Sequence, residues 1–250
     1  MKCILGLLLS LLLVQQLLAQ PSLMESQRGN IRVLNAIKTK EDTLKKQFEN
    51  AGMQWPPKQL YIRSFKYDSQ LEIWARNDSK STFKLFKTYK VCALSGNLGP
   101  KRMEGDYQVP EGFYYINVFN PKSTFHMSLG INYPNASDGM LSDSAQPGGD
   151  IYIHGSCVTV GCIPITDTQI EEVYLLASYA RTSGEDFIPV HIFPIRYNNP
   201  KSVLQLNKVT KDDKDYQHFS ENVKTVYDYF EQNKKLPIIS VNNKGEYVIM

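Results

Sequence analysis

The order of apolar and polar residues predicts helices at both ends of the chain and strands between them. Between residues 20 and 50, apolar side chains recur at helical spacing among many charges, which is typical of one or two amphipathic helices. Residues 52–57 break this pattern with glycine and proline. Strand patterns rich in β-branched and aromatic residues then occupy 59–66, 70–75, 83–94, 113–118, 124–129 and 188–193.

The tail from about residue 197 differs in pattern from the strand-rich part of the chain. Residues 219–230 carry helical spacing, and residues 237–250 predict a terminal hairpin around a turn at 242–245. The fold class that follows is α+β, a strand-rich mixed domain with helical N- and C-terminal flanks. Its expected divisions are a leader at 1–19, a helical flank at 20–56, a strand-rich domain at 57–196 and an extension of helix and hairpin at 197–250.

The first 19 residues have the composition of a secretory signal peptide. Lys2 precedes an apolar run that is short for a membrane span, and Ala19 is the expected cleavage point. We therefore expect an exported protein with no stable membrane insertion after cleavage. The net charge of +3 is small and scattered, which argues against nucleic-acid binding, because such proteins concentrate basic residues on one face.

Three cysteines remain once Cys3 leaves with the signal peptide: Cys92, Cys157 and Cys162. An odd number in an exported protein predicts a free, reactive thiol, with or without one disulfide. A long polar stretch at residues 132–149 precedes two of these cysteines. We interpret it as a lid over a neighbouring site, since loops of this length in compact domains are usually functional.

His154 and Cys162 lie in one short segment, between a strand pattern and a helix start. Thr166 and Gln169 form a predicted capping box, so Cys162 lies just before a helix N-terminus. That position favours negative charge and lowers the pKa of a thiol. His154 ends its strand and can act as a general base. Together these features predict a cysteine acyl-transfer site.

Small and polar residues near this pair supply the expected supporting contacts. Gly161 allows a sharp turn beside a substrate carbonyl, and backbone amides there can stabilise an oxyanion. Backbone carbonyls near Gly155, or the side chains of Ser156 and Thr159, are candidates for orienting the imidazole. His126 lies in a strand pattern, where it faces either the cleft or solvent.

Three other interpretations of the segment stay open. His154 and Cys162 could be ordinary structural residues, or Cys157 and Cys162 could form a disulfide that blocks the nucleophile. Alternatively, His154, Cys157 and Cys162 could supply three zinc ligands. The zinc interpretation lacks a defined fourth ligand and a paired Cys-x-x-Cys, so we expect no metal, and nothing in the sequence asks for another cofactor.

A wider pattern extends from about residue 60 to residue 196. It comprises the blocks 83–89, 95–101 and 104–114, the triplet Tyr133-Pro134-Asn135, and the His154-Gly155 and Gly161-Cys162 pairs. This pattern resembles the YkuD-type L,D-transpeptidase catalytic domain, in its YafK-like branch. The resemblance implies a strand-rich mixed domain in which the cysteine faces a cleft.

The resemblance also assigns roles to the segment. It implies that Cys162 is the nucleophile and His154 the base, that Gly161 and Cys162 supply oxyanion-hole amides, and that Gly155 helps to position the histidine. The nucleophile would attack a peptidoglycan stem peptide and form a thioester. The acyl group would then pass to an amine, including one on a wall-linked protein, or to water. The expected location is the periplasm or envelope of a bacterium.

Weaker candidates for substrate binding are His126, Tyr133 and Asn135. The chain also departs from the usual family pattern, because Val160 stands where a second histidine is typical and Pro164 where an arginine often follows the cysteine. Loss of that cation leaves the acceptor open. The alternative function is therefore a peptidoglycan peptide amidase or carboxypeptidase with the same cysteine and histidine. A non-catalytic wall-binding protein is a third interpretation.

Overall fold

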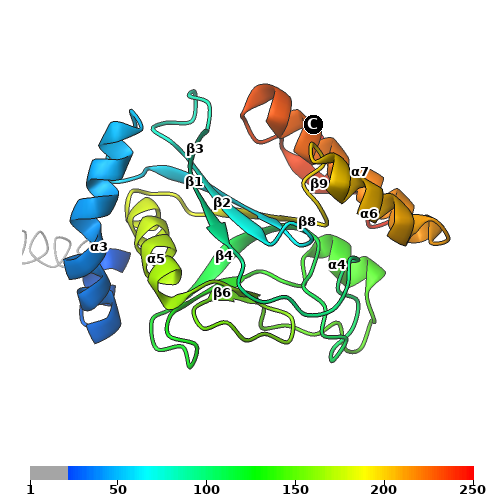
Figure 1. Ribbon diagram of the computed structural model, residues 1–250, viewed down its shortest axis with the longest axis horizontal. Coiled ribbons are helices and arrows are strands. Elements are labelled where there is room, and N and C mark those ends of the chain that lie inside the picture. The colour runs from blue at the N-terminus through cyan, green and yellow to red at the C-terminus, as the bar shows by residue number, and fades with distance from the viewer. Residues whose placement is uncertain (1–21) are drawn as a thin grey trace, which may run out of the picture.

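The structure, a computed structural model, describes residues 22–250 and places helices on both faces of one mixed sheet (Figure 1). The helix α5 lies against one face with α3 outside it, and α6 and α7 cover the other face. The helices are α2 (Leu23–Gln27), α3 (Ile31–Asn50), α4 (Ala136–Leu141), α5 (Asp167–Thr182), α6 (Pro200–Thr210) and α7 (Lys214–Asn233). The signal peptide predicted at 1–19 lies outside the described residues. Within residues 22–250, no helix is both long and apolar enough to cross a membrane.

Eight strands form the sheet in the order β3-β2-β1-β8-β4-β5-β6-β7. They are β1 (Gln59–Phe65), β2 (Gln70–Arg76), β3 (Lys84–Lys90), β4 (Gly112–Asn120), β5 (Ser128–Ile131), β6 (Tyr152–His154), β7 (Ile163–Pro164) and β8 (Pro189–Phe193). β1 pairs in parallel with β8, and β6 with β7, whereas the other neighbours are antiparallel. The predicted terminal hairpin is confirmed as β9 (Ile239–Val241) and β10 (Tyr247–Ile249).

The two edge strands of the sheet, β3 and β7, approach each other at one end. Cys92, two residues beyond β3, donates its backbone N–H to the carbonyl of Pro164, the last residue of β7, at 3.0 Å. A disulfide between Cys92 and Cys157 joins the same region covalently. The sheet is therefore curled, and its first and last strands are linked beside the segment that follows β6.

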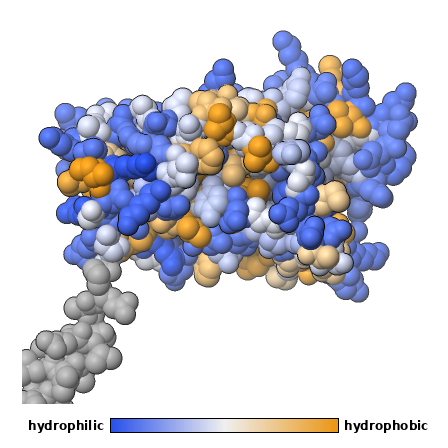
Figure 2. Space-filling model, turned by 90° about the horizontal axis from the view of Figure 1, so that it is seen from below, coloured by the Kyte–Doolittle hydropathy of each residue, from blue (hydrophilic) through white to orange (hydrophobic). Residues whose placement is uncertain are grey.

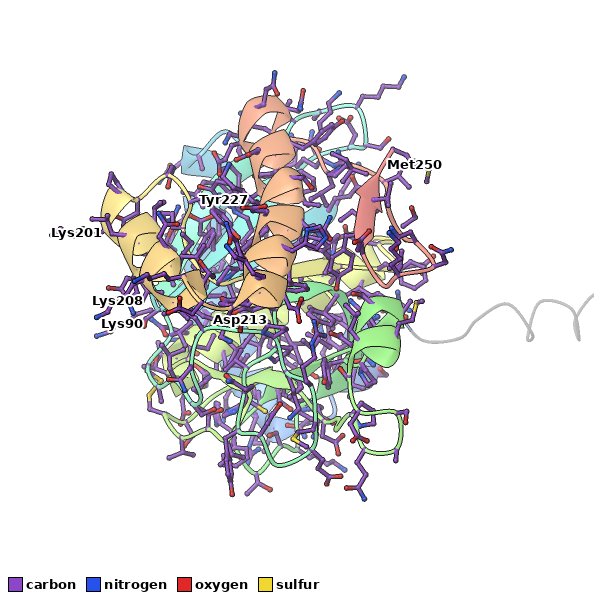
Figure 3. The ribbon with its side chains drawn as sticks, turned by 90° about the vertical axis from the view of Figure 1, so that its right-hand side faces the viewer. Lys90, Lys201, Lys208, Asp213, Tyr227 and Met250 are labelled. Carbon is purple, nitrogen blue, oxygen red and sulfur yellow. A yellow bond between two sulfur atoms is a disulfide. The ribbon has the colours of Figure 1, made fainter. Side chains whose placement is uncertain are left out.

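Alternating side chains of β1 divide the core between the two faces. Ile62 belongs to the apolar cluster that includes the buried residues of α5. Tyr61 points to the other face, where its ring lies 4.8 Å from that of Phe230 on α7. Figure 3 shows this second face, with α6 and α7 neighbouring each other and Lys201 and Lys208 on the outer side of α6. Because both faces are covered, the sheet is a rigid support for the loops at its ends.

The helix predicted after residue 166 is confirmed. Gln169 accepts a hydrogen bond from the Thr166 N–H at 3.1 Å, and the apolar stripe that begins at Ile170 and Val173 is buried. The predicted strand at 124–129 is wrong in its first half, because β5 begins at Ser128. His126 has a φ of 69°, which lies outside the strand region.

The polar stretch at 132–149 is more ordered than a simple loop. It contains α4, whose N-cap Asn135 accepts a hydrogen bond from the Asp138 N–H at 2.9 Å. The buried Ser137 hydroxyl donates to the carbonyl of Gly245 in the terminal hairpin. This stretch is thus fastened to the C-terminal extension, and its role as a lid stays a prediction.

Candidate active site

The parallel pair β6–β7 brings His154 and Cys162 to the same part of the sheet edge. Its register aligns Ile153 with Ile163 and His154 with Pro164, and Cys162 directly precedes β7. The backbone N–H of Tyr152 bonds to the Cys162 thiol, so the thiol lies beside the first residue of the strand that ends at His154. In the described part of the chain their side chains share no direct hydrogen bond, and the Cys162 Sγ instead lies 3.6 Å from the carbonyl oxygen of Asp150.

The His154 imidazole is buried and held in one orientation. Its Nδ1 bonds to the carbonyl oxygen of Gly155, and the Phe125 ring lies against it with the ring centroids 4.7 Å apart. A carbonyl only accepts, so Nδ1 carries the proton and Nε2 is the nitrogen left to accept one. Burial lowers the pKa of His154, and the Gly155 carbonyl opposes this shift. The imidazole is therefore neutral at pH 7 and has the tautomer of a base at Nε2.

Cys162 is a half-buried free thiol among the described residues. Its pKa is raised, first by burial and then by the charge of Asp150, while the backbone N–H of Tyr152 acts in the opposite direction. The expectation of a lowered thiol pKa from the helix N-terminus is therefore wrong. β7 separates Cys162 from the N-cap of α5 at Thr166, so the thiol lies outside the short range of the helix dipole.

The turn before Cys162 is stabilised by Thr159. Its hydroxyl accepts from the Gly161 N–H at 3.1 Å and donates to the Cys162 carbonyl at 2.9 Å. Gly161 has a φ of 146°, and a Cβ there would lie 3.2 Å from the carbonyl oxygen of Gln108, which explains why the position requires glycine. Thr159 thus holds the cysteine turn, whereas the sequence suggested it as a partner of the imidazole.

The residues after His154 are fixed by the start of α5. A Cβ at Gly155 would lie 2.7 Å from Oδ1 of Asp167, so only glycine fits without displacement. The same Oδ1 accepts a hydrogen bond from the Ser156 N–H at 2.8 Å, and Ser156 has a φ of 66°. Sequence reasoning missed Asp167, although an acidic residue in the first turn of a helix is a common acceptor for such amides.

The three weaker substrate-binding candidates are engaged by the protein itself. The His126 Nε2 lies 2.9 Å from Oε1 of Glu171 on α5. The buried Tyr133 donates its hydroxyl proton to the Pro147 carbonyl at 2.9 Å. Asn135 caps α4 and donates its side-chain amide to the carbonyl of Phe113. In this conformation each of the three has at least one side-chain polar atom bonded to another part of the protein.

The disulfide settles two of the open interpretations. Because Cys157 is bonded to Cys92, the alternative Cys157–Cys162 pair is wrong. Zinc binding through Cys157 is wrong for the same reason, since a disulfide sulfur is no thiolate ligand. Across residues 22–250, no group of three or more His, Cys, Asp or Glu side chains is arranged to hold a metal ion.

Two cavities of the described residues are not lined by the cysteine. One of about 460 Å³ is bounded by Leu94, Leu98 and Val209, and one of about 410 Å³ by Leu23, Tyr115 and Phe187. The loop between β6 and β7 instead exposes apolar side chains, with Val158 55% and Val160 71% accessible. Figure 2 shows the molecule from the side where β6 lies in Figure 1, and apolar side chains interrupt its hydrophilic surface.

Comparison with known proteins identifies the family. The family model named YkuD, which describes the L,D-transpeptidase catalytic domain, matches residues 66–192 of this chain. That match covers just over half of the chain. This protein belongs to the L,D-transpeptidase family. The chain is 34% identical over 192 residues to "Putative L,D-transpeptidase YafK" of Escherichia coli strain K12, covering 76% of this chain and 73% of the relative. The same identity and coverage hold for the protein of that name in E. coli O157:H7.

Solved structures align with the chain at lower identity. The helical cell shape determining protein Pgp2 of Campylobacter jejuni aligns with a TM-score of 0.43 and 17% identity, covering 80% of each chain. Bd1075 of Bdellovibrio bacteriovorus aligns with a TM-score of 0.41 and 18% identity, covering 76% of this chain and 79% of that one.

Proposed function

We propose that this member of the L,D-transpeptidase family is an exported enzyme that acts on peptidoglycan stem peptides through a Cys162 thioester. The observation that supports it best is that a free Cys162 lies beside β6, the strand that ends at His154, whose Nε2 is the nitrogen left to accept a proton. The other two cysteines of the described chain are bonded to each other, so Cys162 is the thiol left for chemistry.

The first half-reaction transfers the peptide acyl group to sulfur. The Cys162 Sγ attacks the carbonyl of the amide that follows the L-centre of the diamino acid, and its proton passes to Nε2 of His154. His154 then returns that proton to the departing amine as the carbon–nitrogen bond breaks. In the second half-reaction an amine attacks the thioester, loses a proton to His154 and takes the acyl group, which regenerates the thiol.

The pKa directions determine how the nucleophile is activated. A raised thiol pKa and a lowered imidazole pKa favour the neutral Cys–His pair over the thiolate–imidazolium pair. We therefore propose that His154 removes the proton as the sulfur attacks, as a general base in the transition state. The Cys162 and Gly161 amides would bind the oxyanion. In the free enzyme the Gly161 N–H donates a hydrogen bond to Thr159 Oγ1. This bond must break before the Gly161 amide can bind the oxyanion.

Hydrolysis is the second candidate, with water replacing the amine acceptor. It is favoured by the surroundings of the thiol, where Asp150 contributes negative charge and Pro164 occupies the position at which the family resemblance implies an arginine. A site without that cation binds an acceptor carboxylate more weakly. Water then has more access to the thioester. The non-catalytic alternative predicts a blocked cysteine, and the free, half-buried Cys162 gives it no support.

Export is part of the proposal. The signal peptide that supports it lies outside the described residues, but the Cys92–Cys157 disulfide is the kind of bond that forms in oxidising compartments such as the bacterial periplasm. We place the protein in the periplasm or cell envelope on these two grounds.

Intact-protein mass spectrometry tests the function. Mature wild type and Cys162→Ala are incubated with purified tetrapeptide stems, with and without an added amine. We expect an acyl adduct on wild type alone, with release of the amine product. A crosslinked product in the presence of the amine would identify transpeptidation, and a free carboxylate would identify hydrolysis. Absence of both adduct and turnover on wild type would refute the proposed function.

A further inference from the structure

We propose that Arg32, on α3 of the N-terminal flank, is a positioning residue of the active site: it fixes the 121–126 loop, and that loop holds His154. The inference rests on the proposed role of His154 as the base. Arg32 lies outside residues 66–192, which the family model covers. The functional unit would therefore include the N-terminal helices.

The guanidinium of Arg32 gathers three backbone carbonyls of one loop. Its Nη1 donates to the carbonyl oxygens of Pro121 at 3.3 Å, of Ser123 at 2.6 Å, and of His126. A guanidinium remains charged at all relevant pH values and donates in a fixed plane, so it suits the organisation of several carbonyls. The loop lies beneath the N-terminal end of α3 in Figure 1.

Arg32 is itself held by a rigid element. It lies in the first turn of α3, where its backbone N–H donates to the N-cap Asn30 at 2.9 Å. Next to it, Val33 is fully buried in the core cluster shared with α5, and so is Ala36 one turn later. The Arg32 side chain that binds the 121–126 loop is therefore carried by a packed helix and not by another loop.

The loop contacts the catalytic histidine from two directions. The Phe125 ring lies over the His154 imidazole at an interplanar angle of 30°. The Cβ of His126 lies 3.0 Å from where a Cβ would stand on Gly155, whose carbonyl accepts the Nδ1 proton of His154. The loop thus covers the ring and also abuts the residue that sets its tautomer.

The conformation of this loop requires an external restraint. His126 has a φ of 69°, which costs energy for a residue with a side chain and persists only where neighbouring contacts enforce it. Phe125 is 41% exposed, so contacts on its solvent side do not hold it in place. Arg32 bonds to the carbonyl of His126 itself, and the His126 side chain has a second anchor in Glu171. Removal of Arg32 should loosen the loop without unfolding the domain.

A loosened loop would change the protonation of His154. Burial is the main cause that lowers its pKa, and Phe125 contributes to that burial. The titratable side chains on the elements around the imidazole include Tyr152 on β6, His126 on the loop, Cys162 before β7, and Asp167 and Glu171 on α5. If Phe125 swings away, water reaches the ring and the pKa of His154 rises toward its ordinary value.

The test is an NMR titration of the His154 ring in unliganded protein, with its signal identified by its loss in His154→Gln. The variants are Arg32→Gln, Arg32→Lys and the matched control Lys38→Gln, which removes the same charge from an exposed position of α3. We expect the His154 midpoint to rise in Arg32→Gln, to stay nearer wild type in Arg32→Lys, which keeps a donor, and to be unchanged in Lys38→Gln.

Phe125→Ala provides a second, independent variant. The Phe125 side chain is 41% exposed, so we expect this variant to fold. It should raise the His154 midpoint at least as much as Arg32→Gln does. A midpoint in Arg32→Gln equal to that of wild type overturns the proposal, whether or not Phe125→Ala shifts it.

Kinetics complete the test. A misplaced base should lower kcat of Arg32→Gln by about tenfold or more while KM changes little, since small displacements of catalytic groups have large effects on rate. The acid limb of the kcat/KM profile should move to higher pH with the NMR midpoint. If wild type turns over no stem peptide, the proposed function fails, but the NMR titration still decides whether Arg32 positions His154.

Discussion

At the scale of single residues, Asp150 is the unexpected neighbour of the nucleophile. Its carbonyl oxygen lies 3.6 Å from the Cys162 Sγ, and its Oδ1 lies 3.4 Å from the Tyr152 hydroxyl oxygen. Its φ of 55° is uncommon for a residue with a side chain, and such strain gathers at functional sites. Burial raises the pKa of the Cys162 thiol and the charge of Asp150 adds to that rise, so the free enzyme keeps its nucleophile protonated.

Replacement of Asp150 by asparagine should therefore lower the pKa of the Cys162 thiol, because the nearby negative charge is lost while the side-chain shape is kept. The measurement is the rate of iodoacetamide alkylation as a function of pH. We expect the midpoint to move to lower pH in Asp150→Asn and to stay at the wild-type value in Asp186→Asn, an exposed control. Superimposed profiles for all three proteins would show that Asp150 does not act on the thiol.

At the scale of elements, the disulfide links the segment after β3 to the loop between β6 and β7. It closes a loop of 65 residues between Cys92 and Cys157. The same loop between β6 and β7 carries the turn that Thr159 stabilises before Cys162. The crosslink therefore restrains both the sheet edge and the segment that presents the nucleophile.

The double variant Cys92→Ser/Cys157→Ser should lose about 4 kcal/mol of unfolding free energy, the size expected when a loop of this length is no longer closed in the unfolded chain. Urea unfolding of the oxidised wild type and the variant measures the difference. Reduced wild type serves as the control and should unfold near the variant. Equal stability of the oxidised and reduced wild type would contradict this role.

The elements differ in how well the sequence predicts them. The start of α5 was predictable, because Thr166 and Gln169 are close in sequence and their cap is local. The helix α6 was missed although Pro200 at its first turn and Asn199 at its N-cap are recognisable signals. β7 has two residues, too few for any periodic pattern.

The candidate site shows the same division. The His154–Cys162 pair and the glycines beside it could be predicted, because they lie in one segment with an informative spacing. The Cys92–Cys157 pairing could not, since only the curled sheet brings those residues together. The effect of Asp150 on the thiol and the contacts of Arg32 also depend on tertiary packing, which leaves no periodic trace in the sequence.

At the scale of the whole molecule, the segment after α5 is joined to the start of the sheet by a partly buried carboxyl group. Glu185 accepts a hydrogen bond from the Leu60 N–H at 2.7 Å. Burial raises the pKa of Glu185 to about 8, against a lowering by the Leu60 N–H and by Arg76. The folded protein therefore retains a proton at neutral pH that the unfolded chain releases.

Stability should consequently depend on pH through this group. Because the folded pKa of about 8 exceeds the ordinary value of 4.5, Glu185 makes the unfolding free energy fall as pH rises between those two values. Urea unfolding at pH 5 and pH 8 measures the loss. Glu185→Gln keeps an acceptor for the Leu60 N–H and should show a smaller loss than wild type. An equal loss in both proteins would assign the pH dependence to other groups.

The contact between the segment after β3 and the end of β7 also bears on how the protein behaves at high concentration. An open sheet edge offers unpaired backbone groups to a second chain, which is a common start of aggregation. Here the two edges meet at Cys92 and Pro164, and the remaining length of β3 carries Lys84, Lys87 and Lys90. Like charges along an edge repel a second copy of that edge. Lys84 and Lys90 thus oppose the pairing of a second chain along β3.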